Sequence, residues 1–152
     1  MLGRSIAALL VAVPFAVQAQ SHPLVGAWDI EYAAGMRIDN DGPTPIMAKA
    51  RMTVVAQGDS LIATVKTVPP EGMPARADMR LATKVASGQV TFVYRSQVRM
   101  NMNGEESVRE SVSTWLLDVN GDSLTGTMGR EISGAEMHPT PPQPVKGTRA
   151  KS

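Results

Sequence analysis

The sequence predicts an all-β protein, an eight-stranded antiparallel up-and-down β-barrel. Turn signals divide the chain into short segments, and apolar side chains alternate with polar ones in most of these segments. An apolar period of 3.6 residues is sustained nowhere, which argues against helices. Eight short antiparallel strands must close on themselves or leave an exposed edge, and closure removes that edge. A barrel is therefore favoured over a two-sheet sandwich.

The first 19 residues have the composition of a signal peptide. Arg4 supplies a positive charge, residues 6–17 are almost wholly apolar, and small residues precede the expected cut after Ala19. An apolar run of this length is too short for a membrane span, which takes about 20 residues. We expect residues 20–152 to form a single β-barrel domain with no membrane span.

Charge and cysteine content restrict the surroundings and the partners of this domain. The chain has 15 basic and 14 acidic side chains, and the only charged residue of the expected leader is Arg4, so the remainder is balanced. A balanced charge gives no electrostatic footprint for nucleic acid. The chain contains no cysteine, which excludes disulfides. Export without disulfides is more typical of bacteria, so we expect a periplasmic or secreted bacterial protein.

Seven breaks separate the eight predicted strands. Asn-Gly and Asp-Gly accept the positive φ angles of tight hairpin turns, so most neighbouring strands should be antiparallel and adjacent. Two of the breaks are longer and rich in proline. In chain order, the breaks lie at Asp41-Gly42, Gly58-Asp59, Pro69-Pro70, Ser87-Gly88, Asn103-Gly104, Asn120-Gly121 and Pro139 to Pro144.

The four segments of the first half alternate with a period of two residues. Successive side chains of a strand point to opposite faces, so residues two apart share a face. One face of each segment is apolar, and Thr, Lys and Arg are frequent on the other, as in a sheet with one side in water. In chain order, the residues predicted to face the core are Trp28, Ile30 and Tyr32; Met52, Val54 and Ala56; Leu61, Ala63 and Val65; and Met79, Leu81 and Val85.

The second half continues this pattern in three segments, and an eighth strand is predicted after the last Pro-rich break. The residues predicted to face the core there are Val90, Phe92, Tyr94, Val98 and Met100; Trp115, Leu117 and Val119; and Leu124, Gly126 and Met128. In the sixth strand, Val108 and Val112 fall out of phase with Trp115. An extra residue shifts the phase of alternation, so a bulge is predicted near Ser113.

Two short motifs resemble those of the calycin superfamily, the lipocalin and avidin type of barrel. Gly26 and Trp28 form a G-x-W motif at the start of the meander, and Arg149 follows Gly147 at its end. The resemblance implies that Trp28 is a structural plug at the closed end and that Arg149 packs across it. A guanidinium over an indole is favourable by roughly 0.5–2 kcal/mol. A repeated Asp-Ser-Leu sequence also resembles small exported bacterial barrels of lipocalin-like shape.

An eight-stranded barrel is just wide enough to be filled by side chains or to hold one small ligand. Small residues on the predicted inner face leave space, methionines adapt to irregular shapes, and the hydroxyl of Tyr94 can orient a polar group. We expect a small, mainly apolar ligand; the alternative is a filled barrel that acts as a structural or protein-protein interaction module. The expected ligand-binding residues are Met52, Ala63, Phe92, Tyr94, Ser96, Met100 and Trp115.

Metal motifs are weak in this sequence. Met100, Met102, Met137 and His138 carry soft ligands that suit Cu(I), but a spacing of two residues is what any strand face provides. Residues 118–122 begin like a calcium-binding loop and lack its required Gly and bidentate Glu. We predict a hairpin turn there, no metal site and no cofactor.

No arrangement of residues specifies catalysis. A nucleophile with a base, a histidine pair and a Gly-rich phosphate loop are all missing from the sequence. Glu110 and Asp29 are the candidate acids if the protein is an enzyme, with Tyr94 as a proton partner; we expect no enzymatic activity. Three residues are apolar on predicted outer faces, which leaves either a monomer or a homodimer open; they are Ile62, Val93 and Leu116.

Overall fold

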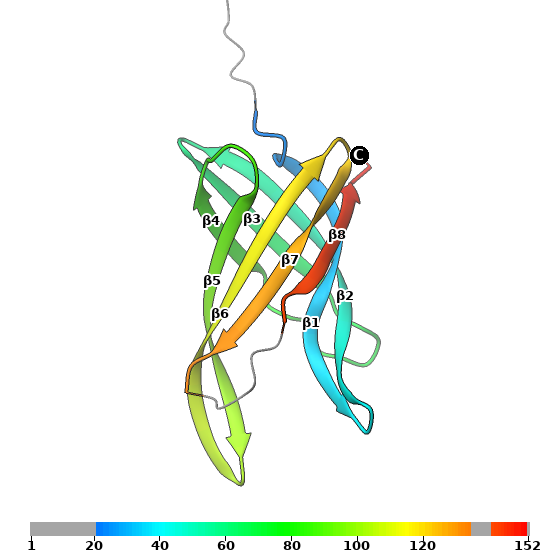
Figure 1. Cartoon of the computed structure of the whole chain (residues 1–152), viewed down its shortest axis with the longest axis vertical. Coiled ribbons are helices and arrows are strands. Elements are labelled where there is room, and N and C mark those ends of the chain that lie inside the picture. Colours follow the sequence, from blue (N-terminus) through cyan, green and yellow to red (C-terminus); the bar gives the residue numbers. More distant parts are fainter. Residues whose placement is uncertain (1–20, 135–140, 152) are drawn as a thin grey trace, which may run out of the picture.

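The computed structural model describes residues 21–134 and 141–151, and this part of the chain contains eight strands and no helix. The strands form one antiparallel sheet that curls into a nearly closed barrel (Figure 1), which confirms the predicted fold class. The predicted signal peptide, Met137 and His138 lie outside the described residues. The strands are β1 (Gly26–Asp39), β2 (Gly42–Gln57), β3 (Ser60–Val68), β4 (Met79–Lys84), β5 (Val90–Met102), β6 (Glu105–Asn120), β7 (Ser123–Ile132) and β8 (Gln143–Arg149).

The order of the strands in the sheet is β4-β3-β2-β1-β8-β7-β6-β5. Every strand therefore pairs with its neighbour in the chain except at β4 and β5, while the first and last strands pair with each other. The seam of the barrel lies between two consecutive strands in the middle of the chain. β4 has 6 residues and β5 has 13, so much of the edge of β5 has no counterpart.

Two-residue turns join four of the hairpins, as their sequences predict. The backbone φ angles of Asn103 and Gly104 are 56° and 86°, the positive values that a type I′ turn requires. The predicted breaks on described residues lie between strands or at their ends, except that Pro144 lies within β8. The residue pairs that flank the four turns are Asp39 and Gly42, Gln57 and Ser60, Met102 and Glu105, and Asn120 and Ser123.

The bulge predicted near Ser113 is wrong, because β6 keeps an unbroken register with both of its neighbours. Ser111 and Ser113 face the interior in phase with Trp115, and Val108 faces outward with 59% of its surface exposed. The prediction assumed that the apolar residues of this strand point inward. The register shifts instead in β1, where Ala34 has no partner on β2.

Two further predictions of inward-facing residues are wrong at the ends of strands. Ala56 is exposed near the end of β2, and Val85 follows the end of β4 with 45% of its surface exposed. Alternation predicts burial only where neighbouring strands continue on both sides. The other predicted core residues lie on the interior face, buried or half-buried.

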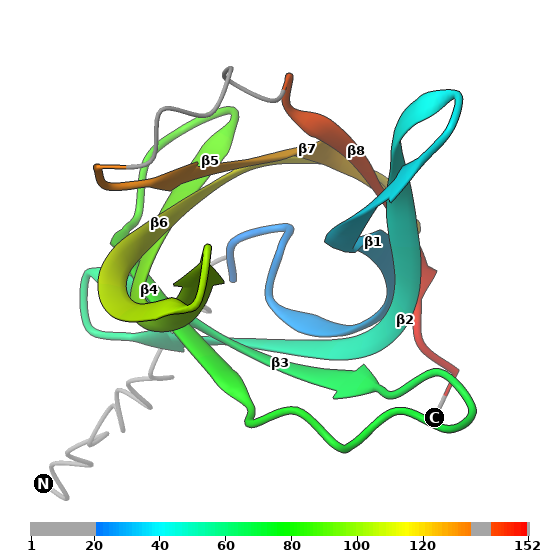
Figure 2. The ribbon, with the colours of Figure 1, turned by 90° about the horizontal axis from the view of Figure 1, so that it is seen from below.

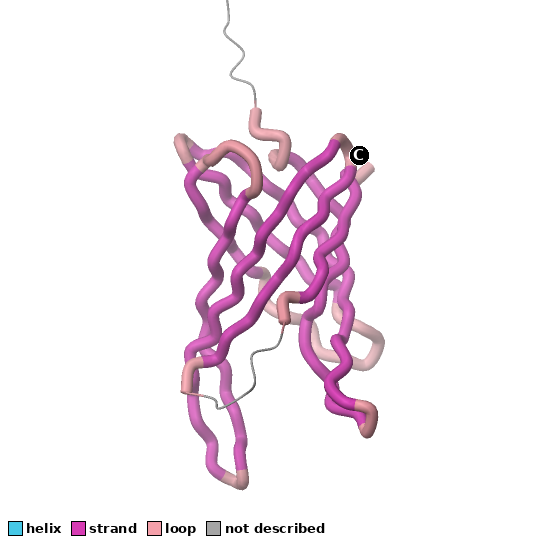
Figure 3. The backbone as a smooth tube through the Cα atoms, viewed as in Figure 1, coloured by secondary structure: helices cyan, strands magenta, loops and turns pink. Residues whose placement is uncertain are grey.

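The two ends of the barrel differ. At the closed end, the segment before β1 lies within the outline of the ring (Figure 2), and its Leu24 is fully buried. At the open end, the β1–β2 and β5–β6 hairpins project beyond the other strands (Figure 3). The terms closed end and open end are used in this sense below.

Candidate functional site

Trp28 and Arg149 form the plug of the closed end. Trp28 is fully buried, and the guanidinium carbon of Arg149 lies 4.3 Å from the centroid of the Trp28 ring. The contact that the calycin resemblance implies is therefore present. Trp28 Nε1 donates a hydrogen bond of 2.9 Å to the carbonyl oxygen of Leu24. Arg149 donates to the carbonyl oxygens of Pro23 and Val25 at 3.1 and 3.2 Å.

Gly26 explains why the motif before Trp28 begins with glycine. Its φ angle is 132°, and a Cβ atom at this position would lie 2.8 Å from Nη1 of Arg149. Side chains other than glycine are strained at such φ angles. The glycine of the G-x-W motif thus allows the guanidinium of Arg149 to approach the backbone.

The interior changes from apolar to polar along the barrel axis, in layers that the strand register defines. Phe92, Trp115 and Met128 are paired across β5, β6 and β7 and are all buried. The next layer toward the open end contains Tyr94, Ser113 and Arg130. The layer after that contains Ser96, Ser111 and Ile132. On β6, Ser113 and Ser111 follow Trp115 on the inner face, and these short side chains leave space.

That space is a cavity of about 200 Å³ in the open half of the barrel. Its inner wall is rich in hydroxyl groups, and Tyr32 and Thr67 are joined there by a hydrogen bond of 2.6 Å. The aromatic ring of Tyr32 packs on Trp115 with 5.1 Å between their centroids, so the cavity rests directly on the apolar core. The lining residues are Tyr32, Thr67, Arg76, Ala77, Met79, Tyr94, Ser96, Val98, Ser111, Ser113 and Arg130.

Two arginines line the mouth of the cavity. Arg130 is the register partner of Ser113 on the interior face of β7, and Arg76 comes from the connection between β3 and β4. Nη1 of Arg76 donates a hydrogen bond of 3.0 Å to the carbonyl oxygen of Ala34, the residue that the β1 irregularity leaves without a strand partner. The irregular backbone of β1 thus helps to hold Arg76 at the cavity.

The two guanidinium groups influence each other. Partial burial lowers the pKa of Arg130 from its ordinary value, the positive charge of Arg76 lowers it further, and Tyr32 opposes the shift. Among the described residues, no carboxylate lies within 4.0 Å of either guanidinium. The mouth of the cavity is therefore a region of concentrated positive charge.

The structure places only part of the predicted binding set in this cavity. Tyr94 and Ser96 line it. Met100 is half-buried farther along β5 and does not line it. The remaining predicted residues are fully buried in the packed core and do not line this cavity; they are Met52, Ala63, Phe92 and Trp115.

Only Tyr94 and Ser96 of the lining residues belong to the predicted binding set, and Arg130 and the two serines of β6 are among those that the prediction missed. Arg130 follows Met128 by two residues, so alternation alone would have placed it on the inner face. Ser111 and Ser113 likewise precede Trp115 in phase. A prediction that sorts residues by polarity assigns all three to the surface.

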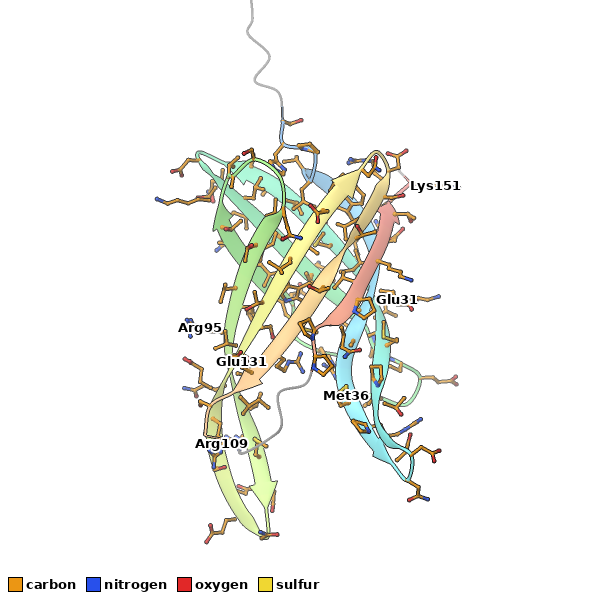
Figure 4. The ribbon with its side chains drawn as sticks, viewed as in Figure 1. Glu31, Met36, Arg95, Arg109, Glu131 and Lys151 are labelled. Carbon is orange, nitrogen blue, oxygen red and sulfur yellow. The ribbon has the colours of Figure 1, made fainter. Side chains whose placement is uncertain are left out.

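The candidate acids lie outside the cavity. Glu110 forms an exposed ion pair of 3.1 Å with Arg95, which projects away from the barrel wall (Figure 4). Asp29 forms an exposed ion pair of 2.7 Å with Arg51. Neither acid lines the cavity that contains Tyr94.

In the part of the chain that the structure describes, no three His, Cys, Asp or Glu residues are grouped so that they could hold a metal ion. The same part contains no helix long and apolar enough to cross a membrane.

The chain matches no protein-family model, no curated protein and no solved structure at a significant level. Its class therefore follows from architecture alone: an eight-stranded, antiparallel, nearly closed β-barrel that fits a calycin-like fold.

Proposed function

We propose that the protein is a small-molecule binding protein that holds its ligand in the open half of the barrel. The observation that carries the proposal is the cavity of about 200 Å³, which lies at one end of a barrel whose other end is plugged. Binding sites are typically concave, with a few placed polar groups among apolar ones. Here Met79 and Val98 supply apolar wall, and hydroxyls and guanidinium groups supply polar contacts.

The size and lining of the cavity restrict the kind of ligand that it can hold. Pockets for drug-sized ligands usually measure about 300–1,000 Å³, so this cavity fits a smaller molecule. The sequence predicted a small and mainly apolar ligand. The proposal keeps the small size and adds polar groups to the ligand, because several of the lining side chains carry hydroxyl groups.

The proposal also covers the relationship of the protein to known barrels and its location in the cell. The packing of Arg149 on Trp28 supports a relationship to lipocalin-like calycins. The leader-like residues 1–19 support export, and the lack of cysteine favours a bacterial periplasm or medium. In this setting the protein would carry or sense a small solute outside the cytoplasm.

A protein-protein interaction module is the second candidate, and the seam of the barrel favours it. Among the described residues, β5 forms no ladder on the side that faces β4, and its Val93 has 45% of its surface exposed. A strand edge of this kind can pair with an added strand.

Native mass spectrometry of the protein purified from a bacterial periplasm tests the first proposal. We expect an extra mass that survives native conditions and disappears after denaturation. Ser113→Leu should abolish the extra mass, because it places an apolar side chain in the cavity. Thr114→Leu, one residue along the same strand and on the outer face, is the matched control.

Three outcomes contradict the proposal. A bare monomer mass shows that the barrel has no retained ligand. An extra mass that is equal in Ser113→Leu and the wild-type protein places the ligand elsewhere. A bare dimer favours the interaction module and directs attention to the seam.

A further inference from the structure

The strongest unexplained feature of the cavity is its pair of arginines. Arg76 and Arg130 arise from different elements, a loop and the interior face of β7, and both line the same small space. Both residues remain exposed, so a ligand can reach them without opening the barrel. Arg76 uses one donor group on the carbonyl oxygen of Ala34. A guanidinium has five N–H donors, so most of those on the two side chains are available for a ligand.

The positive charges of Arg76 and Arg130 repel each other at the mouth of the cavity, where Arg130 is partly buried. The lowered pKa of Arg130 reflects both its partial burial and the charge of Arg76. No described carboxylate lies within 4.0 Å of either group. Other arginines of the barrel do have such partners, as Arg51 and Arg95 show on the outer wall. The interior pair is arranged for a counter-charge that the described chain does not supply.

We infer that the ligand is a small organic acid whose oxyanion binds between Arg76 and Arg130. This inference rests on the proposed binding function. The planar fork of a guanidinium matches the oxygens of a carboxylate or a phosphate and forms paired, charge-assisted hydrogen bonds with them. The hydroxyl of Ser113 lies opposite Arg130 in the register and can donate to the same group.

The cavity also selects against other ligands. Among the residues that the structure describes, no acidic side chain lines it, so a cationic ligand would meet two positive charges there. Its volume of about 200 Å³ excludes a long acyl chain from the interior. A short body beside the rings of Tyr32 and Tyr94, with its anionic group at the mouth, uses both parts of the lining.

Isothermal titration of the wild-type protein with three probes tests the charge requirement. Benzoate and phenyl phosphate carry the two oxyanions, and benzamide is a neutral molecule shaped like benzoate. Charge-assisted hydrogen bonds predict that at least one anion binds about 10- to 100-fold more tightly than benzamide. The tighter of the two anions identifies the ligand as a carboxylic acid or a phosphate ester.

Four variants test which arginines supply the positive charge for anion binding. Arg130→Gln and Arg76→Gln should each weaken binding of the preferred anion about tenfold or more. Arg130→Lys should recover part of this loss, because it restores the charge without the fork. Arg99→Gln removes a positive charge from the outer face of β5 and should leave affinity within about twofold, since exposed charges at a distance are screened. A cooperative thermal transition within a few degrees of that of the wild-type protein confirms that each variant is folded.

The outcomes separate this inference from the proposed function. Equal binding of benzoate and benzamide, or unchanged anion binding in both Gln variants, overturns the anion inference and leaves a binding barrel. A neutral molecule identified in the native mass spectrum would likewise overturn the anion inference and leave the proposed binding function. A bare protein that binds none of the three probes overturns both proposals.

Discussion

The closed and open halves of this barrel are built from the same eight strands and have opposite characters. At the closed end, large side chains fill the interior, and the polar groups of Trp28 and Arg149 donate hydrogen bonds to nearby carbonyls. At the open end, serine, threonine and tyrosine line a cavity, and two guanidinium groups lack a described counter-charge. Large buried side chains are concentrated in the closed half, and the polar cavity lies in the open half.

The difference teaches how a small barrel without disulfides combines stability with a candidate binding site. Burial of large apolar side chains is the main stabilising term in a domain of this size. Charged groups without a counter-charge contribute little to stability and are typical of binding sites. Each prediction below compares a change in one half with a matched change elsewhere.

Removal of the plug should have the largest effect. Trp28→Ala deletes a fully buried indole and the surface on which Arg149 lies, so the free energy of unfolding should fall by about 3–5 kcal/mol. Urea unfolding followed by circular dichroism measures this. Val93→Ala, at an exposed position on β5, should change stability by less than about 0.5 kcal/mol. Equal effects of the two substitutions would show that the closed end is not the stable half.

A close approach of two strands near the closed end should have the next largest effect. A Cβ atom on Gly126 would overlap the backbone carbonyl of Leu116, whereas one on Gly129 would lie 3.8 Å from Pro142. Gly126→Ala should therefore lower the free energy of unfolding by about 1–3 kcal/mol through overpacking. Gly129→Ala, on the same strand, should be nearly neutral. Thermal unfolding of both variants measures the difference, and a neutral Gly126→Ala would contradict the register of β6 and β7.

Most of the barrel follows from two local signals. Alternation identifies the inner face because a strand has a fixed period of two residues, and the Asn-Gly and Asp-Gly signals place the turns because their φ angles require such residues. The plug was predicted from the resemblance of Gly26, Trp28 and Arg149 to calycin motifs, and the contact is physically reasonable because a cation over an indole is favourable. Alternation and turn sequences are local signals, so they do not depend on which distant strands pair.

The seam and the cavity do not follow from local signals. The pairing of β1 with β8, and the lack of pairing between β4 and β5, depend on how the whole sheet curls. Arg76 lies in an irregular loop, and its guanidinium is held by a long-range hydrogen bond to the carbonyl oxygen of Ala34. Ser111, Ser113 and Arg130 were predictable from phase, but an expectation of an apolar interior outweighed it. Polar residues in phase with a core strand are thus the signal to look for.

The two tryptophans allow a finer comparison of the halves. Trp28 Nε1 has a hydrogen-bond partner, whereas the buried Trp115 Nε1 has none among the described residues. An unpaired buried donor is costly, so its removal offsets part of the lost packing. Trp28→Phe should therefore destabilise the protein by about 1 kcal/mol more than Trp115→Phe. Chemical denaturation of both variants measures this difference, and equal losses would indicate that Trp115 Nε1 has a partner such as a bound water.

The smallest effect on stability should come from Arg130, one of the two arginines that we propose bind the ligand. The pKa of Arg130 is lowered in the folded protein, so its proton is bound more tightly in the unfolded chain, and its charge opposes folding at neutral pH. Arg130→Gln should therefore raise the free energy of unfolding slightly, by less than about 0.5 kcal/mol at this exposed position. Arg99→Gln on the outer wall provides the baseline for loss of one charge, and differential scanning calorimetry without ligand compares the two. A loss of stability greater than that of Arg99→Gln would mean that Arg130 packs as a structural residue. A gain, together with weaker anion binding, would show that the open half retains this charge for its ligand at the expense of the fold.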